Sequence, residues 1–314
     1  MYLDVKRIEF LVTLNCTGKC KHCQASEMLN TGERFSIDAV KACEAVTKLT
    51  KIFDVNYVLT FGGEPLLAWE IVCAIQQAAY DSGVEGRGVI TNGYFSKDPA
   101  QIAKVAQHLA AAPIRGILLS VDAFHQETIP VEPVRLFAEE LLKAGMQNLR
   151  LHPAWVVDAS HPNPYNRRTK ELLGKFADLD IEVSDGNNIF LMGNAAKYLA
   201  EYYDEPTLDL SLGCGRMPYT EPLDAMTSIS ILPNGDVKVC WFTIGNIYRE
   251  DIDTIVTRYN PYEHQLMRIV LREGVAGLVG YAKTMGIEID LGKYYTACGV
   301  CQAVGEKIVQ RLAS

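Results

Sequence analysis

The chain has 314 residues, of which 48% are hydrophobic and 22% are charged, a composition typical of folded globular proteins. Its formal net charge of −8 argues against nucleic-acid binding, which requires a stripe of basic side chains. Charged residues near the N-terminus exclude a signal peptide, and no apolar run is long enough to span a membrane, so we expect a cytoplasmic protein without a membrane partner.

Strand and helix patterns alternate through the first half of the chain. Strands are predicted over residues 7–14, 56–61, 86–91, 115–121, 148–157 and 181–184. Helices are predicted between them, and the first, over 37–52, is expected to have Ser36 as its N-cap. Short strands separated by helices indicate an α/β fold with parallel βαβ units. Because a closed eightfold barrel takes about 250 residues, six units predict a partial (β/α)6 barrel.

The pattern changes after about residue 205. Residues 226–240 are typical of a β-hairpin, because two alternating segments flank a Pro-Asn-Gly turn. Helices are predicted over residues 249–259, 261–271 and 275–285, and a segment with a Cys-x2-Cys pair, residues 296–312, closes the pattern. We therefore expect a barrel domain over residues 1–205 and a small cysteine-rich domain of a hairpin plus helices over 206–314.

Nine cysteines in a cytoplasmic protein indicate metal or redox chemistry rather than disulfides. Cys43 and Cys73 lie in predicted helices and are interpreted as small core residues. The other seven form an N-terminal set of three and a C-terminal set of four, which are Cys16, Cys20 and Cys23, and Cys214, Cys240, Cys298 and Cys301.

The N-terminal set directly follows the first predicted strand. Three thiols make only part of a tetrahedral zinc site, which would need a fourth ligand from elsewhere in the chain. Three thiolates suit a 4Fe–4S cube instead, because they hold three irons and leave the fourth open for chemistry. Both interpretations stay open on the spacing alone.

This Cys-x3-Cys-x2-Cys loop resembles that of the radical S-adenosylmethionine (SAM) enzymes. Three further stretches match the family after successive strands, namely GGEP at 62–65, TNG at 91–93 and SVD at 120–122. The resemblance implies a 4Fe–4S cluster and SAM as cofactors. It also implies that SAM is cleaved reductively to a 5′-deoxyadenosyl radical, which abstracts hydrogen from a substrate. An electron donor such as flavodoxin or ferredoxin is then expected.

The resemblance also implies roles for residues at the carboxyl ends of the strands, where parallel sheets bind ligands. The methionine ammonium of SAM is expected at Gly62, Gly63 and Glu64. The SAM carboxylate and ribose are expected near Asn92, Ser120 and Asp122, and the adenine beside His22. Two candidate catalytic residues follow from position alone: His125 as an acid–base group and Tyr94 as a cavity residue. Solvation or packing is the alternative for both.

The C-terminal cysteines resemble those of the twitch or SPASM type of auxiliary domain. The chain has no cysteines left for a second auxiliary cluster, so we expect a twitch-like domain with one fully ligated 4Fe–4S cluster. A structural zinc site with four thiolates is the alternative that the spacing permits. A fully ligated cluster is expected to carry electrons rather than bind substrate.

Relatives with twitch domains modify peptides or dehydrogenate small molecules. We expect oxidative crosslinking or a related modification of a ribosomally made peptide, for which a separate peptide-recognition protein is a candidate partner. A small-molecule dehydrogenase is the first alternative. The chain also resembles a peptide epimerase, but Trp241 stands where that enzyme has its hydrogen-donating cysteine. A non-catalytic zinc or iron–sulfur protein is the alternative from a different class.

Overall fold

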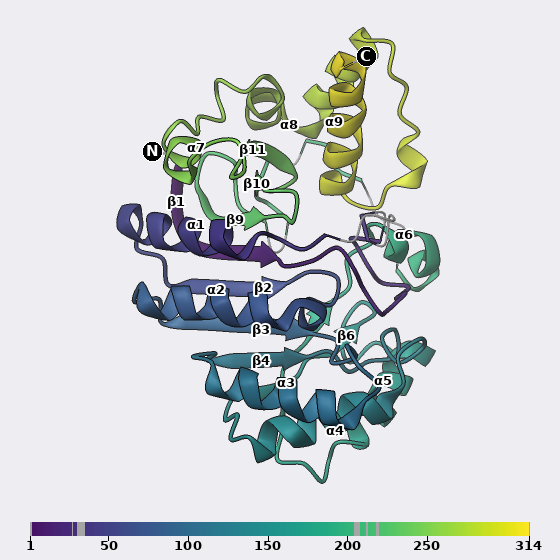
Figure 1. The fold of residues 1–314 in the computed structure, drawn as a ribbon. Coiled ribbons are helices and arrows are strands. Elements are labelled where there is room, and N and C mark those ends of the chain that lie inside the picture. The colour runs from purple at the N-terminus through teal and green to yellow at the C-terminus, as the bar shows by residue number, and fades with distance from the viewer. Residues whose placement is uncertain are drawn as a thin grey trace.

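The apolar strand β1 (Leu3–Leu11) lies inside a nine-stranded sheet that organises the chain, as Figure 1 shows. The computed structural model describes residues 2–26, 28–29, 35–203, 208–211, 213–217 and 220–313. The strands follow the order β11-β10-β9-β1-β2-β3-β4-β5-β7, and those from β1 to β7 are parallel. The predicted α/β fold with a mostly parallel sheet is confirmed.

The remaining strands are β2 (Tyr57–Phe61), β3 (Gly86–Thr91), β4 (Gly116–Leu119), β5 (Leu149–Leu151), β6 (Ala154–Trp155), β7 (Glu182–Val183), β8 (Asn187–Asn188), β9 (Met226–Ile231), β10 (Asp236–Val239) and β11 (Phe242–Asn246). The α-helices are α1 (Ala39–Ile52), α2 (Trp69–Asp81), α3 (Pro99–Ala111), α4 (Val131–Lys143), α5 (Pro164–Gly174), α6 (Asn194–Tyr198), α7 (Ile252–Thr257), α8 (Gln265–Thr284) and α9 (Ala297–Ala313). Short 3₁₀ turns cover Pro65–Ala68, Ala200–Tyr202 and Leu291–Lys293.

Helices α1 to α4 connect the parallel strands and pack beside one another along the sheet (Figure 1). Each buries one apolar stripe, as in α4, where the buried residues recur at helical spacing. The prediction that Ser36 caps α1 is wrong. The N-cap is Asp38, whose carboxylate accepts from the backbone N–H of Lys41 at 2.9 Å, whereas Ser36 pairs with Thr13 in an isolated β-bridge.

The strand predicted over residues 148–157 is divided at Pro153. Proline has no backbone N–H to donate, so the ladder with β4 and β7 ends before it. The chain then continues as β6, which pairs with β8 in a separate two-stranded sheet. This division directs the segment after β5 across the carboxyl end of the main sheet.

The predicted hairpin is present as β9 and β10, which pair in antiparallel fashion. Strand β9 also pairs in parallel with β1, with Phe10 opposite Ile231, so the hairpin extends the barrel sheet at its β1 edge. The two helices predicted over 261–285 are present as the two parts of α8, which are separated by a kink at Gly274, where φ is +67° and the backbone is not helical. The predicted domain boundary at 205/206 lies outside the described residues. No helix in the described part of the chain is long and apolar enough to cross a membrane.

Asn166 of α5 fixes the segment that follows β6. Its side chain is buried, and its Oδ1 accepts from the backbone N–H of Val156 at 3.0 Å. Its amide group donates to the backbone carbonyls of Val156, Asp158 and His161 at 2.7 to 3.1 Å. One side chain therefore satisfies four backbone groups.

We expect Asn166→Ala to lower the free energy of unfolding by about 2–3 kcal/mol, because buried backbone groups lose their partners. The matched control is Asn260→Ala, since that half-buried side chain bonds to Glu263 and satisfies only one backbone group, the N–H of Tyr262. Urea unfolding monitored by circular dichroism measures both. Equal stability of the two variants would contradict the role given to Asn166.

Candidate functional site

The cysteine loop lies against the loop that follows β2. The backbone N–H of Gly63 donates to the carbonyl of Thr13, and that of Glu64 donates to the carbonyl of Asn15, both at 2.8 Å. A Cβ on Gly63 would collide with Asn15 and lie 3.2 Å from the Cβ of Cys16. Glycine is required there because two backbones meet directly. The predicted SAM contacts Gly62 and Gly63 thus also hold the segment that leads into Cys16.

The three N-terminal thiols converge at one place. A Cβ built on Gly18 would lie 3.2 Å from the sulfur of Cys20 and 3.8 Å from that of Cys16. Burial raises the pKa of the Cys16 thiol to about 11 and also raises the pKa values of Cys20 and Cys23. Cys20 feels the charges of both other thiols. Buried, mutually repelling thiolates require a cation, so the set fits a metal cluster.

The C-terminal thiols converge in the same way. Cys240 follows β10 with a φ of +51°, a strained conformation for a residue with a side chain, and Cys298 and Cys301 lie in the first turn of α9. Burial raises the pKa of Cys240 to about 11, and burial together with charge repulsion from the other three cysteines raises that of Cys301 to about 12. Cys214 completes this set of four.

Among the described residues, the one group of at least three potential ligand atoms within 4.8 Å of one another is Cys20, His22 and His125. A tetrahedral zinc ion with bonds of about 2.3 Å would hold four sulfurs about 3.8 Å apart, so a zinc ion at either cysteine set would require the sulfurs to move closer together.

Glu64 connects the loop after β2 to the end of β3 and the loop that follows it. Its carboxylate is fully buried and accepts from the hydroxyl of Thr91 at 2.6 Å and from the backbone N–H groups of Asn92 and Leu66 at 2.8 and 2.9 Å. Burial raises the pKa of Glu64 to about 7, although these donors oppose the rise. The carboxylate predicted to contact SAM thus already has three partners within the protein.

Asn92 joins the third strand to the cysteine loop. Its amide group lies 3.8 Å from the sulfur of Cys16 and 3.3 Å from the hydroxyl of Thr17. Its Oδ1 accepts from the backbone N–H of Tyr94 at 2.8 Å. The side chain of Tyr94 packs against the hydrophobic core, which agrees with the packing alternative. Ser120 is buried beside Thr91, to whose carbonyl it donates its backbone N–H.

Asp122, which is buried, and His125, which is partly buried, form a pair after β4. The Nδ1 of His125 lies 2.8 Å from a carboxylate oxygen of Asp122, which also accepts from the backbone N–H of Ala154 at 3.2 Å. Burial would raise the pKa of Asp122, but His125 and the backbone donors hold it at about 2. Burial likewise would lower the pKa of His125, but Asp122 raises it. His125 is thus held in place by Asp122, with 16% of its side chain exposed.

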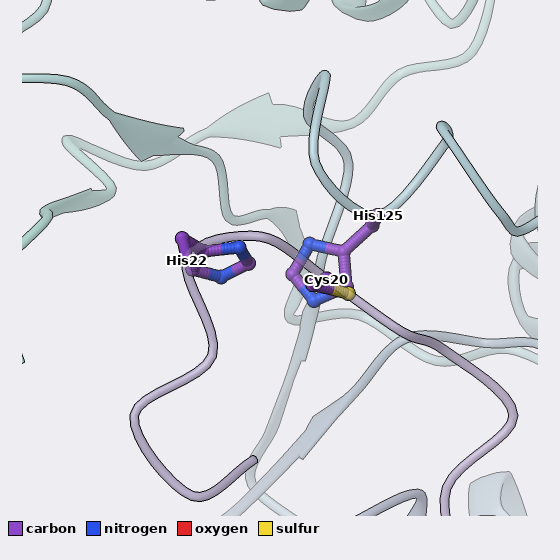
Figure 2. A group of neighbouring side chains, drawn as sticks. All are labelled: Cys20, His22 and His125. Atoms are coloured by element: carbon purple, nitrogen blue, oxygen red, sulfur yellow. The ribbon is translucent and has the colours of Figure 1, made fainter. Parts of the chain in front are cut away.

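His22 lies beside His125, and Figure 2 shows these two side chains together with Cys20. Its ring is 5.0 Å from that of Phe124 and 4.9 Å from that of His125. Burial lowers the pKa of His22 to about 4, and its Nδ1 is buried without a hydrogen-bond partner. The adenine contact predicted for His22 stays a prediction.

The start of α6 also holds the cysteine loop, a contact that the sequence patterns did not indicate. Asn194 donates its backbone N–H to the carbonyl of Cys23 at 3.1 Å and its side-chain amide to that of Cys20 at 3.2 Å. Gly193 precedes it with a φ of +55°, and a Cβ there would lie 2.9 Å from the carbonyl oxygen of Cys23. The only sequence signal was a Gly-Asn pair at a helix start.

A cavity of about 160 Å³ is lined by Cys298 of the C-terminal set and by Gln24, the residue after Cys23. The remaining lining side chains are uncharged, being Phe190, Met192, Met217, Thr220 and Thr296. The cavity thus reaches the C-terminal set directly and the N-terminal set through the neighbour of Cys23.

Comparison with known proteins matches residues 10–194, more than half of the chain, to the Radical SAM superfamily. The chain is 28% identical over 123 residues to the GTP 3′,8-cyclases of Staphylococcus epidermidis and Limosilactobacillus fermentum, which covers 38% of this chain and 34% of each relative. The match therefore spans about a third of these curated relatives.

Among solved structures, a histidine-tagged form of anSMEcpe with bound AdoMet is similar with a TM-score of 0.52 at 13% identity, over 99% of this chain and 94% of that chain. This likeness is one of fold. Together with the family match, it accounts for a parallel sheet whose first loop gathers three cysteines. The chain belongs to the radical SAM superfamily, whose fold binds SAM and a 4Fe–4S cluster.

Proposed function

We propose that the protein oxidises a ribosomally made peptide, using SAM, a 4Fe–4S cluster at Cys16, Cys20 and Cys23, and a second 4Fe–4S cluster at the four C-terminal cysteines. When bound, these groups supply a 5′-deoxyadenosyl radical that takes a hydrogen atom from the substrate and an acceptor for a second electron. The observation that carries the proposal is the cavity that Gln24 and Cys298 line together, because a substrate there would touch Cys298 and the residue that follows Cys23.

The residues around the first site support SAM binding. The loops after β2, β3 and β4 bring Gly62, Asn92 and Ser120 to the carboxyl end of the sheet beside the cysteine loop. Glu64 and Asp122 have their carboxylates bound by internal donors, so we assign them the task of holding these loops in place. The cofactor then meets backbone groups and the side chain of Asn92.

A peptide side chain suits the cavity because the described residues that line it carry no charge. An uncharged lining of thioether, aromatic and hydroxyl groups favours neutral substrate groups. Reduction of the first cluster requires an external donor such as flavodoxin or ferredoxin, and a separate peptide-recognition protein stays a candidate partner.

Small-molecule dehydrogenation is the second candidate, and the similarity to GTP 3′,8-cyclases favours a small-molecule substrate. A triphosphate would need cationic partners, and the described lining of the cavity offers none. We therefore rank the peptide first.

The first prediction tests the N-terminal thiols. Replacing Cys16, Cys20 and Cys23 together by Ala is expected to abolish formation of 5′-deoxyadenosine from SAM under dithionite, because no iron is left with an open position. Replacing Cys43 and Cys73 by Ala is the matched control, which keeps the activity since neither lies in a set. Continued SAM cleavage by the triple variant, measured by chromatography, would refute the assignment.

The second prediction concerns the contact at Gly63. Gly63→Ala is expected to lower the iron content of the first site and SAM cleavage together, since the added Cβ displaces the backbone at Asn15. Gly174→Ala serves as the control, because open space surrounds that glycine. If Gly63→Ala keeps its full iron content and only binds SAM more weakly, the residue acts on the cofactor rather than on the cysteine loop.

The third prediction concerns the fate of the substrate radical. We expect a product lighter by two hydrogens, because Trp241 replaces the thiol that an epimerase uses and the second cluster accepts an electron. Mass spectrometry of a reaction in deuterated water measures this. A product one mass unit heavier, with deuterium at an inverted carbon, would establish epimerisation instead.

A further inference from the structure

The indole ring of Trp241 occupies a fitted position against α9. Trp241 directly follows Cys240, and its ring stacks on Phe242 with centroids 3.8 Å apart at an angle of 29°. A Cβ on Gly305 would overlap the six-membered ring of Trp241. Gly305 follows Cys301 by four residues and therefore lies one helical turn beyond it on the same face. The missing side chain lets the indole reach the turn that carries Cys301.

Both N–H groups of Trp241 lie near C-terminal thiols and act on their pKa values. The indole Nε1 is buried and has no hydrogen-bond partner within ordinary limits, although a buried indole N–H normally has one. Burial raises the pKa of Cys301, and the Trp241 side chain opposes that rise. Burial likewise raises the pKa of Cys240, and the backbone N–H of Trp241 opposes it. A negatively charged sulfur of Cys301 would therefore give the buried indole N–H of Trp241 the hydrogen-bond acceptor that it lacks.

We propose that Trp241 is a positioning residue that raises the reduction potential of the auxiliary cluster, its indole N–H donating to the sulfur of Cys301. This inference rests on the proposed function, because it requires a cluster at the four C-terminal cysteines. Hydrogen bonds to ligand sulfurs stabilise the reduced, more negative state of a cluster and so raise its potential. A higher potential suits a cluster that accepts an electron from a substrate radical.

The test measures the potential of the second cluster in the full-length holoprotein. Its electron paramagnetic resonance signal is the one that added SAM leaves unchanged. In Trp241→Phe, which keeps an aromatic ring but loses the N–H, the midpoint of this signal is expected to become more negative. At the wild-type midpoint, the ratio of reduced to oxidised cluster therefore falls several-fold.

Two further variants separate this role from packing. Gly305→Ala is expected to shift the potential in the same direction, since it displaces the indole without changing a ligand. Trp69→Phe is the matched control and is expected to leave the potential unchanged, because that indole packs on His108 at the surface of α2 and α3.

A measurement on the unmutated protein covers the case in which a variant fails to fold. Tryptophan labelled with ¹⁵N at the indole is expected to give a nitrogen hyperfine coupling in the reduced second cluster, and absence of the coupling would overturn the inference. An unchanged potential in Trp241→Phe, with the second signal present, would also overturn it while leaving the proposed function intact. A holoprotein with only the SAM-responsive signal would overturn both.

Discussion

The backbone of the loop after β2 lies in direct contact with the backbone of the cysteine loop, and the rest of the site depends on that contact. Two hydrogen bonds, from Gly63 to Thr13 and from Glu64 to Asn15, fix the approach to Cys16. The absence of a side chain at Gly63 makes the contact possible. Asn194 holds the far end of the same loop through the carbonyls of Cys20 and Cys23. The loop is therefore held at both ends by contacts within the protein.

Buried carboxylates then connect the neighbouring strands to that loop. Glu64 ties the loop after β2 to the loop after β3, and Asp122 ties the loop after β4 to the start of β6. The two carboxylates have different hydrogen-bond partners. Asp122 is paired with His125, whereas Glu64 accepts hydrogen bonds from neutral groups only. The pKa of Asp122 is consequently lowered and that of Glu64 is raised. Both groups stiffen the carboxyl end of the sheet on which the cofactor is proposed to bind.

Much of this arrangement was predictable because it is local in sequence. The cysteine spacings, the alternation of strands and helices, and the hairpin at Pro-Asn-Gly are each set by residues close together in the chain. Proline at position 153 divides the fifth predicted strand, a break that its missing N–H explains. Helix α1 begins two residues later than predicted, because Asp38 and not Ser36 accepts the capping hydrogen bond.

Contacts between distant residues were not predictable from the sequence patterns. Asn194 and Cys20 are 174 positions apart, and the parallel pairing of β9 with β1 joins segments more than 200 residues apart. Neither contact is marked by a sequence periodicity or a motif, because each results from the packing of whole helices and strands against one another. The internal partners of Glu64 and the pairing of His125 with Asp122 are of the same kind.

Anaerobic analysis of iron, acid-labile sulfide and zinc in the purified protein tests the central claim most directly, because two sets of converging thiols are assigned to two cubes. The account predicts about eight irons and about eight sulfides per chain, with negligible zinc. About four irons together with one zinc would mean that the C-terminal cysteines hold a structural zinc ion. Zinc at both sets, without iron, would contradict the account altogether.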